Sequence, residues 1–109
     1  MRRGTTAPLD IVIGGVDLTE ATLYVSLKQG STEIYTKDET RGDVTRVYDS
    51  AKDETTISIT YTQAQTLSLK AGRAYLQVRW IFDNGSADAT RSVELMIQDI
   101  QHEGEIVYV

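Results

Sequence analysis

The feature that most constrains the fold is an alternation of apolar and polar residues that recurs along the chain. The longest run places Leu76, Val78 and Trp80 on one side and Gln77 and Arg79 on the other. A period of two is typical of β-strands that bury one face. This alternation, with the β-branched and aromatic composition of the segments, predicts strands at residues 9–13, 23–27, 33–36, 44–48, 57–61, 76–82 and 93–97.

Segments rich in glycine and asparagine separate these predicted strands. Asn84-Gly85 tolerates the positive φ of a tight turn and predicts a hairpin at residues 83–86, and residues 29–31 predict another. Residues 62–66 indicate one helical turn that crosses between sheets. Thr62 would cap this turn, and either Leu67 or Leu69 would plug the edge of the core.

These segments predict an all-β protein with an immunoglobulin-like two-sheet β-sandwich of about seven strands. A length of 109 residues suits one domain. We expect the sandwich at residues 8–100, a polar arm at residues 1–7, and a tail or an added edge strand at residues 101–109. The cysteine pair of antibody domains is absent, so only the architecture is implied.

The composition excludes several classes of site and partner. The chain has no cysteine and one histidine, which excludes thiol catalysis, disulfides, cysteine-ligated zinc and histidine-rich metal centres. Its net charge of -5 argues against nucleic acid and anionic membranes as partners, because both attract positive surfaces. No cofactor and no metal ion is predicted.

No targeting segment is expected. The apolar run at residues 9–13 contains Asp10 and stops at Gly14-Gly15, so it is too short and too polar for a secretion signal. No apolar stretch approaches the length of a transmembrane helix. We therefore expect the chain to stay in the cytoplasm where it is made.

The sequence gives little support for a catalytic site. The acidic residues at 38–43 and 49–54 alternate with lysine and arginine, which is typical of solvated loops. A calcium site or a catalytic carboxylate pair remains an alternative, although the spacing of an EF-hand loop is missing. His102 has polar neighbours and no nucleophile motif to serve, so we interpret it as an exposed tail residue. An enzyme is not predicted.

The aromatic residues and the terminal arginines supply the candidate contacts. Parity places Trp80 and Phe82 on the apolar side of their strand, whereas Tyr24 and Tyr75 fall on wetter faces. Arg2 starts an arm that would dock onto an acidic neighbouring subunit or simply be solvated, and deleting the arm should weaken assembly and spare the fold. The predicted protein-interface residues are Arg2, Arg3, Tyr24, Tyr75, Gln77, Arg79, Ile81 and Tyr108.

Several short motifs resemble a known family of proteins. They are Arg3-Gly4-Thr5-Thr6, Val16-Asp17-Leu18-Thr19, residues 23–29, Thr56-Ile57-Ser58-Ile59, residues 62–66, Gln77-Val78-Arg79 and Gly104-Glu105-Ile106. Together they resemble small structural proteins of tailed phages and prophages of Gram-positive bacteria. They are also similar to the immunoglobulin-like N-terminal domain of phage baseplate upper proteins. The family pattern has a proline directly after the Thr-Thr pair, whereas here Ala7 comes before Pro8.

The resemblance implies a non-enzymatic virion protein of the tail or baseplate. Such a protein would bind other phage structural proteins, form homo-oligomers, and move from the host cytoplasm into the virion. The alternative is a carbohydrate- or surface-binding β-sandwich module, since sandwiches often carry such sites. The resemblance brings no catalytic residues with it.

Overall fold

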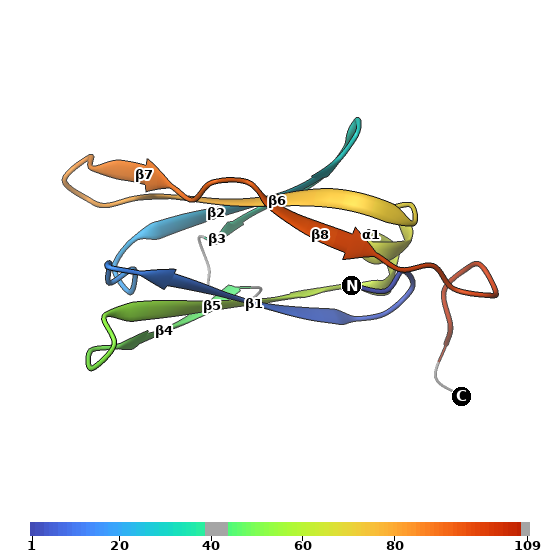
Figure 1. The fold of residues 1–109 in the computed structure, drawn as a ribbon, viewed down its shortest axis with the longest axis horizontal. Helices are drawn as coiled ribbons and strands as arrows, with labels where there is room; N and C mark the ends of the chain where they lie inside the picture. Colours follow the sequence, from blue (N-terminus) through green and yellow to red (C-terminus); the bar gives the residue numbers. More distant parts are fainter. Residues whose placement is uncertain (39–43, 108–109) are drawn as a thin grey trace.

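Two antiparallel sheets face each other in the computed structural model of this protein, which describes residues 1–38 and 44–107 (Figure 1). One sheet has the order β1-β5-β4, and the other has the order β3-β2-β6, followed by β7 and β8. The elements in chain order are β1 (Ala7–Gly14), β2 (Thr22–Gln29), β3 (Thr32–Asp38), β4 (Val44–Asp49), β5 (Glu54–Tyr61), α1 (Gln63–Leu67), β6 (Gly72–Ile81), β7 (Ala87–Ala89) and β8 (Val93–Ile97).

The strand order is that of an immunoglobulin-like sandwich. β1-β5-β4 corresponds to strands B-E-D, and β3-β2-β6-β8 corresponds to C′-C-F-G. The predicted fold class is therefore confirmed. In the described part of the chain, no strand takes the position of strand A beside β1.

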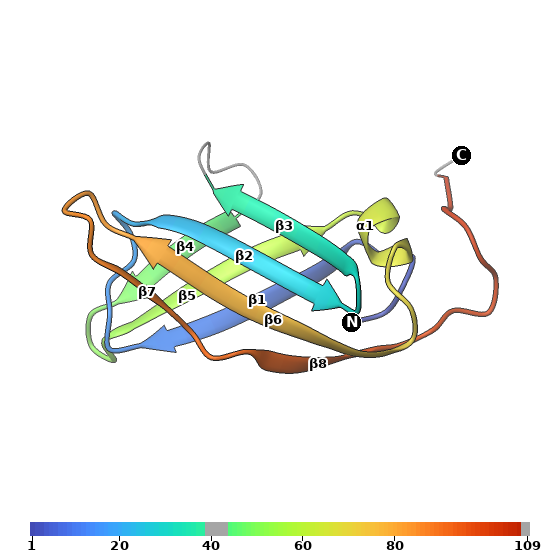
Figure 2. The ribbon, with the colours of Figure 1, turned by 90° about the horizontal axis from the view of Figure 1, so that it is seen from above.

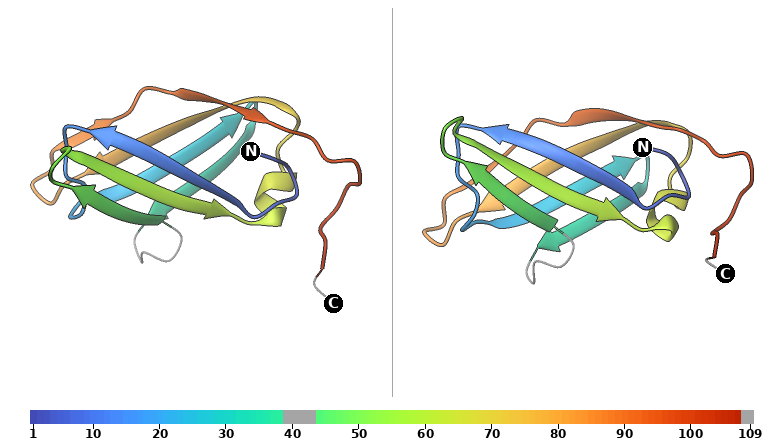
Figure 3. Two further views of the ribbon diagram at one scale, coloured as in Figure 1. Left: turned by 60° about the horizontal axis from the view of Figure 1, so that its bottom comes forward. Right: turned by 90° about the horizontal axis from the view of Figure 1, so that it is seen from below.

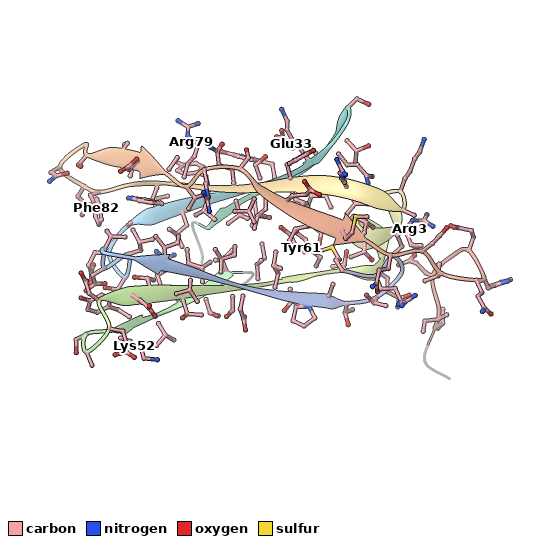
Figure 4. The ribbon with its side chains drawn as sticks, in the orientation of Figure 1. Arg3, Glu33, Lys52, Tyr61, Arg79 and Phe82 are labelled. Atoms are coloured by element: carbon pink, nitrogen blue, oxygen red, sulfur yellow. The ribbon has the colours of Figure 1, made fainter. Side chains whose placement is uncertain are left out.

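The alternating side chains form the core between the two sheets. The buried residues come from the inner faces of β2, β5 and β6, and they include Leu23, Val25 and Leu27, Ile57, Ile59 and Tyr61, and Leu76, Val78 and Trp80. Trp80 is buried as predicted, whereas Phe82 follows the end of β6 and packs half-buried against the core. Figure 4 shows Tyr61 between the layers. Burial of each such side chain contributes about 1.5–3 kcal/mol relative to leaving it exposed.

The predicted helical turn is α1, which connects β5 of one sheet to β6 of the other. Thr62 caps it in a capping box. The Gln65 backbone N–H donates to Thr62 Oγ1 at 3.1 Å, and the Thr62 N–H donates to Gln65 Oε1 at 2.9 Å. Leu69 is fully buried and Leu67 only partly, so Leu69 is the plug.

The last edge of the larger sheet is broken into two strands. β7 pairs with residues 79–81 of β6, and β8 pairs with residues 72–76. Thr90 bridges the break, because its N–H donates to the Val78 carbonyl at 2.8 Å and its Oγ1 accepts from the Val78 N–H at 3.1 Å. The alternating pattern predicts β8 but not β7, because the three residues of β7 are all exposed and do not alternate.

The first residues of the chain lie against the end of β8 (Figure 2). The Gln98 N–H donates to the Met1 carbonyl at 2.7 Å, and the Arg3 N–H donates to the Gln98 carbonyl at 2.9 Å. Arg2 forms a parallel bridge with Gln98, and Ala7 is buried as the first residue of β1. Residues 1–7 are thus hydrogen-bonded to the sandwich, while residues 101–107 form no strand.

Candidate interaction surface

The outer face of the larger sheet gathers five of the predicted interface residues. β2 places Tyr24 there, and β6 places Tyr75, Gln77, Arg79 and Ile81 there. The register sets Tyr24 opposite Arg79, and the period of two puts both on the face opposite the core. Figure 4 shows Arg79 pointing outward from this sheet. We call these five residues the β2–β6 face.

The β2–β6 face combines apolar area with charge. The side chain of Tyr75 is 46% exposed and that of Ile81 is 39% exposed. Two cations that flank the face are paired, since Lys28 lies 3.4 Å from Glu33 and Arg73 lies 3.3 Å from Glu94. Arg79 is exposed, and its guanidinium has no ion-pair partner among the residues that the structure describes. An unpaired arginine beside aromatic and apolar side chains is typical of a protein-binding surface.

One end of the face is hollowed. The rings of Tyr24 and Tyr35 stack with centroids 6.2 Å apart and an interplanar angle of 30°. With Arg79 and Ile81 they line a shallow hollow of about 190 Å³. A stacked aromatic pair beside an arginine can hold a flat apolar group or a sugar ring.

Tyr35 lines this hollow but is not among the predicted interface residues. The loop Gly30-Ser31 joins β2 to β3, and the register pairs Gln29 with Thr32. A two-residue loop at this position would have set Tyr35 opposite Ser26 and hence on the face of Tyr24. The length of the loop between the two strands therefore predicts the position of Tyr35.

The terminal arginines bind their own chain. Arg3, whose side chain is 11% exposed, donates to the carbonyls of Leu69 at 2.5 Å and Leu67 at 3.2 Å. It also forms ion pairs with Asp99, at 2.9 Å, and with Glu103. These bonds raise the pKa of Arg3 and lower the pKa of Glu103. The Arg3 side chain thus binds the end of α1 and the C-terminal segment, and it does not project from the surface.

Arg2 remains exposed, and it donates to the Asp99 carbonyl at 2.7 Å and to Gln98 Oε1 at 3.1 Å. Tyr108, the last predicted interface residue, lies outside the described residues. The N-terminal end of the chain therefore lies about the C-terminal end of β8, and not on the β2–β6 face.

Among the described candidate catalytic groups, His102, Asp49 and Asp53 are exposed and Asp49 and Asp53 bind within a turn. In the turn between β4 and β5, Asp53 accepts from the Tyr48 hydroxyl at 2.7 Å, and Asp49 accepts from the Ala51 N–H at 3.0 Å. The other acidic loop falls largely at residues 39–43, outside the described residues. Among the side chains that the structure describes, no three from histidine, aspartate or glutamate come together as a set of metal ligands.

No family model matches the chain, and no curated protein matches it. None of the described helices is long and apolar enough to cross a membrane.

Proposed function

We propose that this chain is a non-enzymatic structural protein of a phage virion, in the tail or baseplate, and that it works by binding other proteins. The observation that carries the binding role is the β2–β6 face, where residues from two strands form one exposed surface of mixed apolar and cationic character. The phage assignment is supported by the resemblance of its short motifs to structural proteins of tailed phages.

The direct test of the virion role is mass spectrometry of phage particles purified from an induced host that carries this gene. We expect many copies of the chain in each particle. A chain that is abundant in the cell and missing from intact particles would overturn the virion role.

The docking role of the β2–β6 face is tested with matched charge reversals. Arg79→Glu changes the unpaired cation of the face, and Lys52→Glu makes the same change in the exposed turn between β4 and β5 (Figure 4). We expect Arg79→Glu to lower incorporation into particles at least about tenfold, as for other central interface residues. Lys52→Glu should incorporate like the unmodified chain. Equal incorporation of the two variants would show that the face does not dock.

The alternative is a carbohydrate-binding module, and the hollow of Tyr24 and Tyr35 favours it. A glycan array probed with the purified chain tests this function. If sugar binds in the hollow, Tyr35→Ala should abolish the signal, and Tyr75→Ala, on the same face outside the hollow, should retain it. Absence of binding on the array would remove this candidate.

A further inference from the structure

The outer edge of β1 offers backbone groups to another strand. Within the described residues, β1 pairs only with β5. The Gly15 N–H donates to the Asp53 carbonyl at 2.7 Å and continues the hydrogen-bond ladder between β1 and β5. The backbone N–H and C=O groups of the odd-numbered residues of β1 therefore point toward β5, and those of the even-numbered residues point away from it. Pro8 has no N–H and is tolerated at an even-numbered position, because the N–H of such a position would not pair with β5. The N–H groups of Asp10 and Val12 therefore point to the open edge.

The inner side of this edge is also incompletely covered. Leu9 and Ile11 of β1 and Leu95 of β8 pack against the core but remain partly exposed. Val93 pairs with the inward-facing Leu76, yet its side chain is 43% exposed. In an immunoglobulin-like sandwich strand A pairs with strand B, which is β1 here. The backbone of residues 1–3 reaches only the end of β8, as Figure 3 shows.

The C-terminal segment carries apolar side chains that its own sandwich leaves uncovered. Ile106 is 76% exposed and Val107 is 81% exposed. Gln63 of α1 holds the backbone of Ile106, because its Nε2 donates to the Ile106 carbonyl at 3.0 Å and its Oε1 accepts from the Ile106 N–H at 2.8 Å. These two hydrogen bonds hold the backbone at Ile106 beside α1 and not at the edge of β1, while the side chains of Ile106 and Val107 are exposed to solvent.

We propose that the segment beginning at Gly104 of one copy adds as a strand to the open edge of β1 in a second copy. The main-chain groups of the segment would pair with Asp10 and Val12. Because successive side chains of a strand point to opposite faces, one of Ile106 and Val107 would cover the half-exposed Leu9 and Ile11, and the other would lie on the outer face beside the exposed Val12. The segment suits this role, because isoleucine, valine and tyrosine from Ile106 onward favour strands.

This inference deepens the proposed assembly role and rests on it for its biological meaning, while its physical test needs only the purified chain. Pairing through backbone and apolar groups is little screened by salt, in contrast to docking through Arg79. We therefore expect self-association that depends on protein concentration and persists at about 1 M salt, where the Debye length is about 3 Å.

The test is sedimentation of the purified chain with two pairs of variants. Ile106→Asp with Val107→Asp places charges on the donated segment, and His102→Asp with Gln101→Asp places the same charges before it. Val12→Pro removes an edge N–H at a position equivalent to Pro8, and Val12→Ala keeps that N–H. We expect the first variant of each pair to stay monomeric at concentrations where its control and the unmodified chain assemble. Circular dichroism verifies that all variants are folded.

Hydrogen exchange locates the new pairing. We expect the amides of Asp10 and Val12 to exchange at least about tenfold more slowly in the assembly than in the monomer, as ladder bonds protect them. A chain that stays monomeric at all concentrations would overturn the inference. Assembly that survives Ile106→Asp with Val107→Asp, or that leaves both amides unprotected, would overturn it too. Incorporation into particles is measured separately, so either proposal can fail without the other.

Discussion

Tyr61 shows how much a single polar atom can matter in this core. Its side chain is buried between the sheets, and its hydroxyl has no hydrogen-bond partner in the described part of the chain. A buried hydroxyl without a partner costs free energy, because water solvates it in the unfolded chain. The same burial raises the pKa of Tyr61 to about 12.

We predict that Tyr61→Phe raises the free energy of unfolding by about 1 kcal/mol, since it removes the unpartnered hydroxyl and keeps the ring. The pKa of Tyr61 is higher in the folded state than in the unfolded chain, where it is about 10. Tyr61 therefore ionises first in the unfolded chain, and the free energy of unfolding falls as the pH rises from about 10 toward 12. Tyr61→Phe should therefore weaken the loss of stability above pH 10. Urea unfolding at pH 7 and pH 11 measures both effects, with Tyr75→Phe, at an exposed tyrosine, as the control. A lower stability of Tyr61→Phe at pH 7 would contradict this view.

Arg3 connects three parts of the chain through one guanidinium. Hydrogen bonds from Arg3 lower the pKa of Glu103, and the Ile100 N–H together with Arg3 lowers the pKa of Asp99. A carboxylate with a lowered folded pKa stabilises the fold above its unfolded pKa, which is about 4 for these groups. That contribution is lost as the pH falls through the lower, folded pKa.

We predict that Arg3→Ala lowers stability at pH 7 and flattens its decline below about pH 4, because the two carboxylates lose their partner. Arg3→Lys should recover only part of the effect, since one ammonium cannot reach two carboxylates and two carbonyls with a guanidinium's fork of donors. Thermal unfolding from pH 2 to pH 7 tests this. An unchanged pH profile in Arg3→Ala would mean that the pairs contribute nothing.

At the scale of the element, the strands follow directly from local pattern. Each predicted strand is present, because a period of two needs only neighbouring residues to define it. β7 has no such pattern, since Ala87, Asp88 and Ala89 are all exposed. These residues pair with β6 because the preceding turn returns the chain to the edge of that strand.

The turn before β7 refines the predicted hairpin. The Phe82 N–H donates to the Ser86 carbonyl at 2.9 Å, which leaves a three-residue loop, and Gly85 has φ 86°. We predict that Gly85→Ala destabilises the protein by about 1–2 kcal/mol, because a Cβ is strained at positive φ. Gly14→Ala is the matched control, since Gly14 lacks positive φ and has open space for a Cβ. Equal unfolding free energies for the two variants would show that the loop adapts.

Considered as a whole, the molecule brings its first residues and the C-terminal segment up to Ile106 to the α1 end of the sandwich (Figure 2). Met1 packs against the core, Arg3 binds α1 and the C-terminal segment, and the Thr66 hydroxyl donates to the Thr5 carbonyl at 2.9 Å. The expectation that residues 1–7 form an independent arm was based on their polarity alone. Polarity reports solvent contact, and it does not report which carbonyls and carboxylates the tertiary fold brings near.

We predict that removal of residues 1–6 lowers the melting temperature by at least about 4 °C, because the apolar contact of Met1 alone is worth about 1 kcal/mol. At concentrations where the chain is monomeric, removal of residues 105–109 should leave the melting temperature nearly unchanged, since the described part of that segment is exposed. Calorimetry of both truncated chains checks the difference. Equal melting temperatures would show that residues 1–6 contribute nothing to the stability of the sandwich, as expected of a polar arm outside the core.

Local patterns along the chain are sufficient to predict the fold class, the seven longer strands, the cap of α1 and the side of the sheet on which Tyr24, Tyr75 and Arg79 lie. All of these depend on spacing along the chain, where the pleat and the helical turn convert residue number into direction. In contrast, the stacking of Tyr35 on Tyr24, the ion pairs of Arg3 with Asp99 and Glu103, and the open edge that β1 has among the described residues depend on the folded arrangement. These contacts join segments whose relative position depends on how two sheets pack together, and no local period encodes that packing.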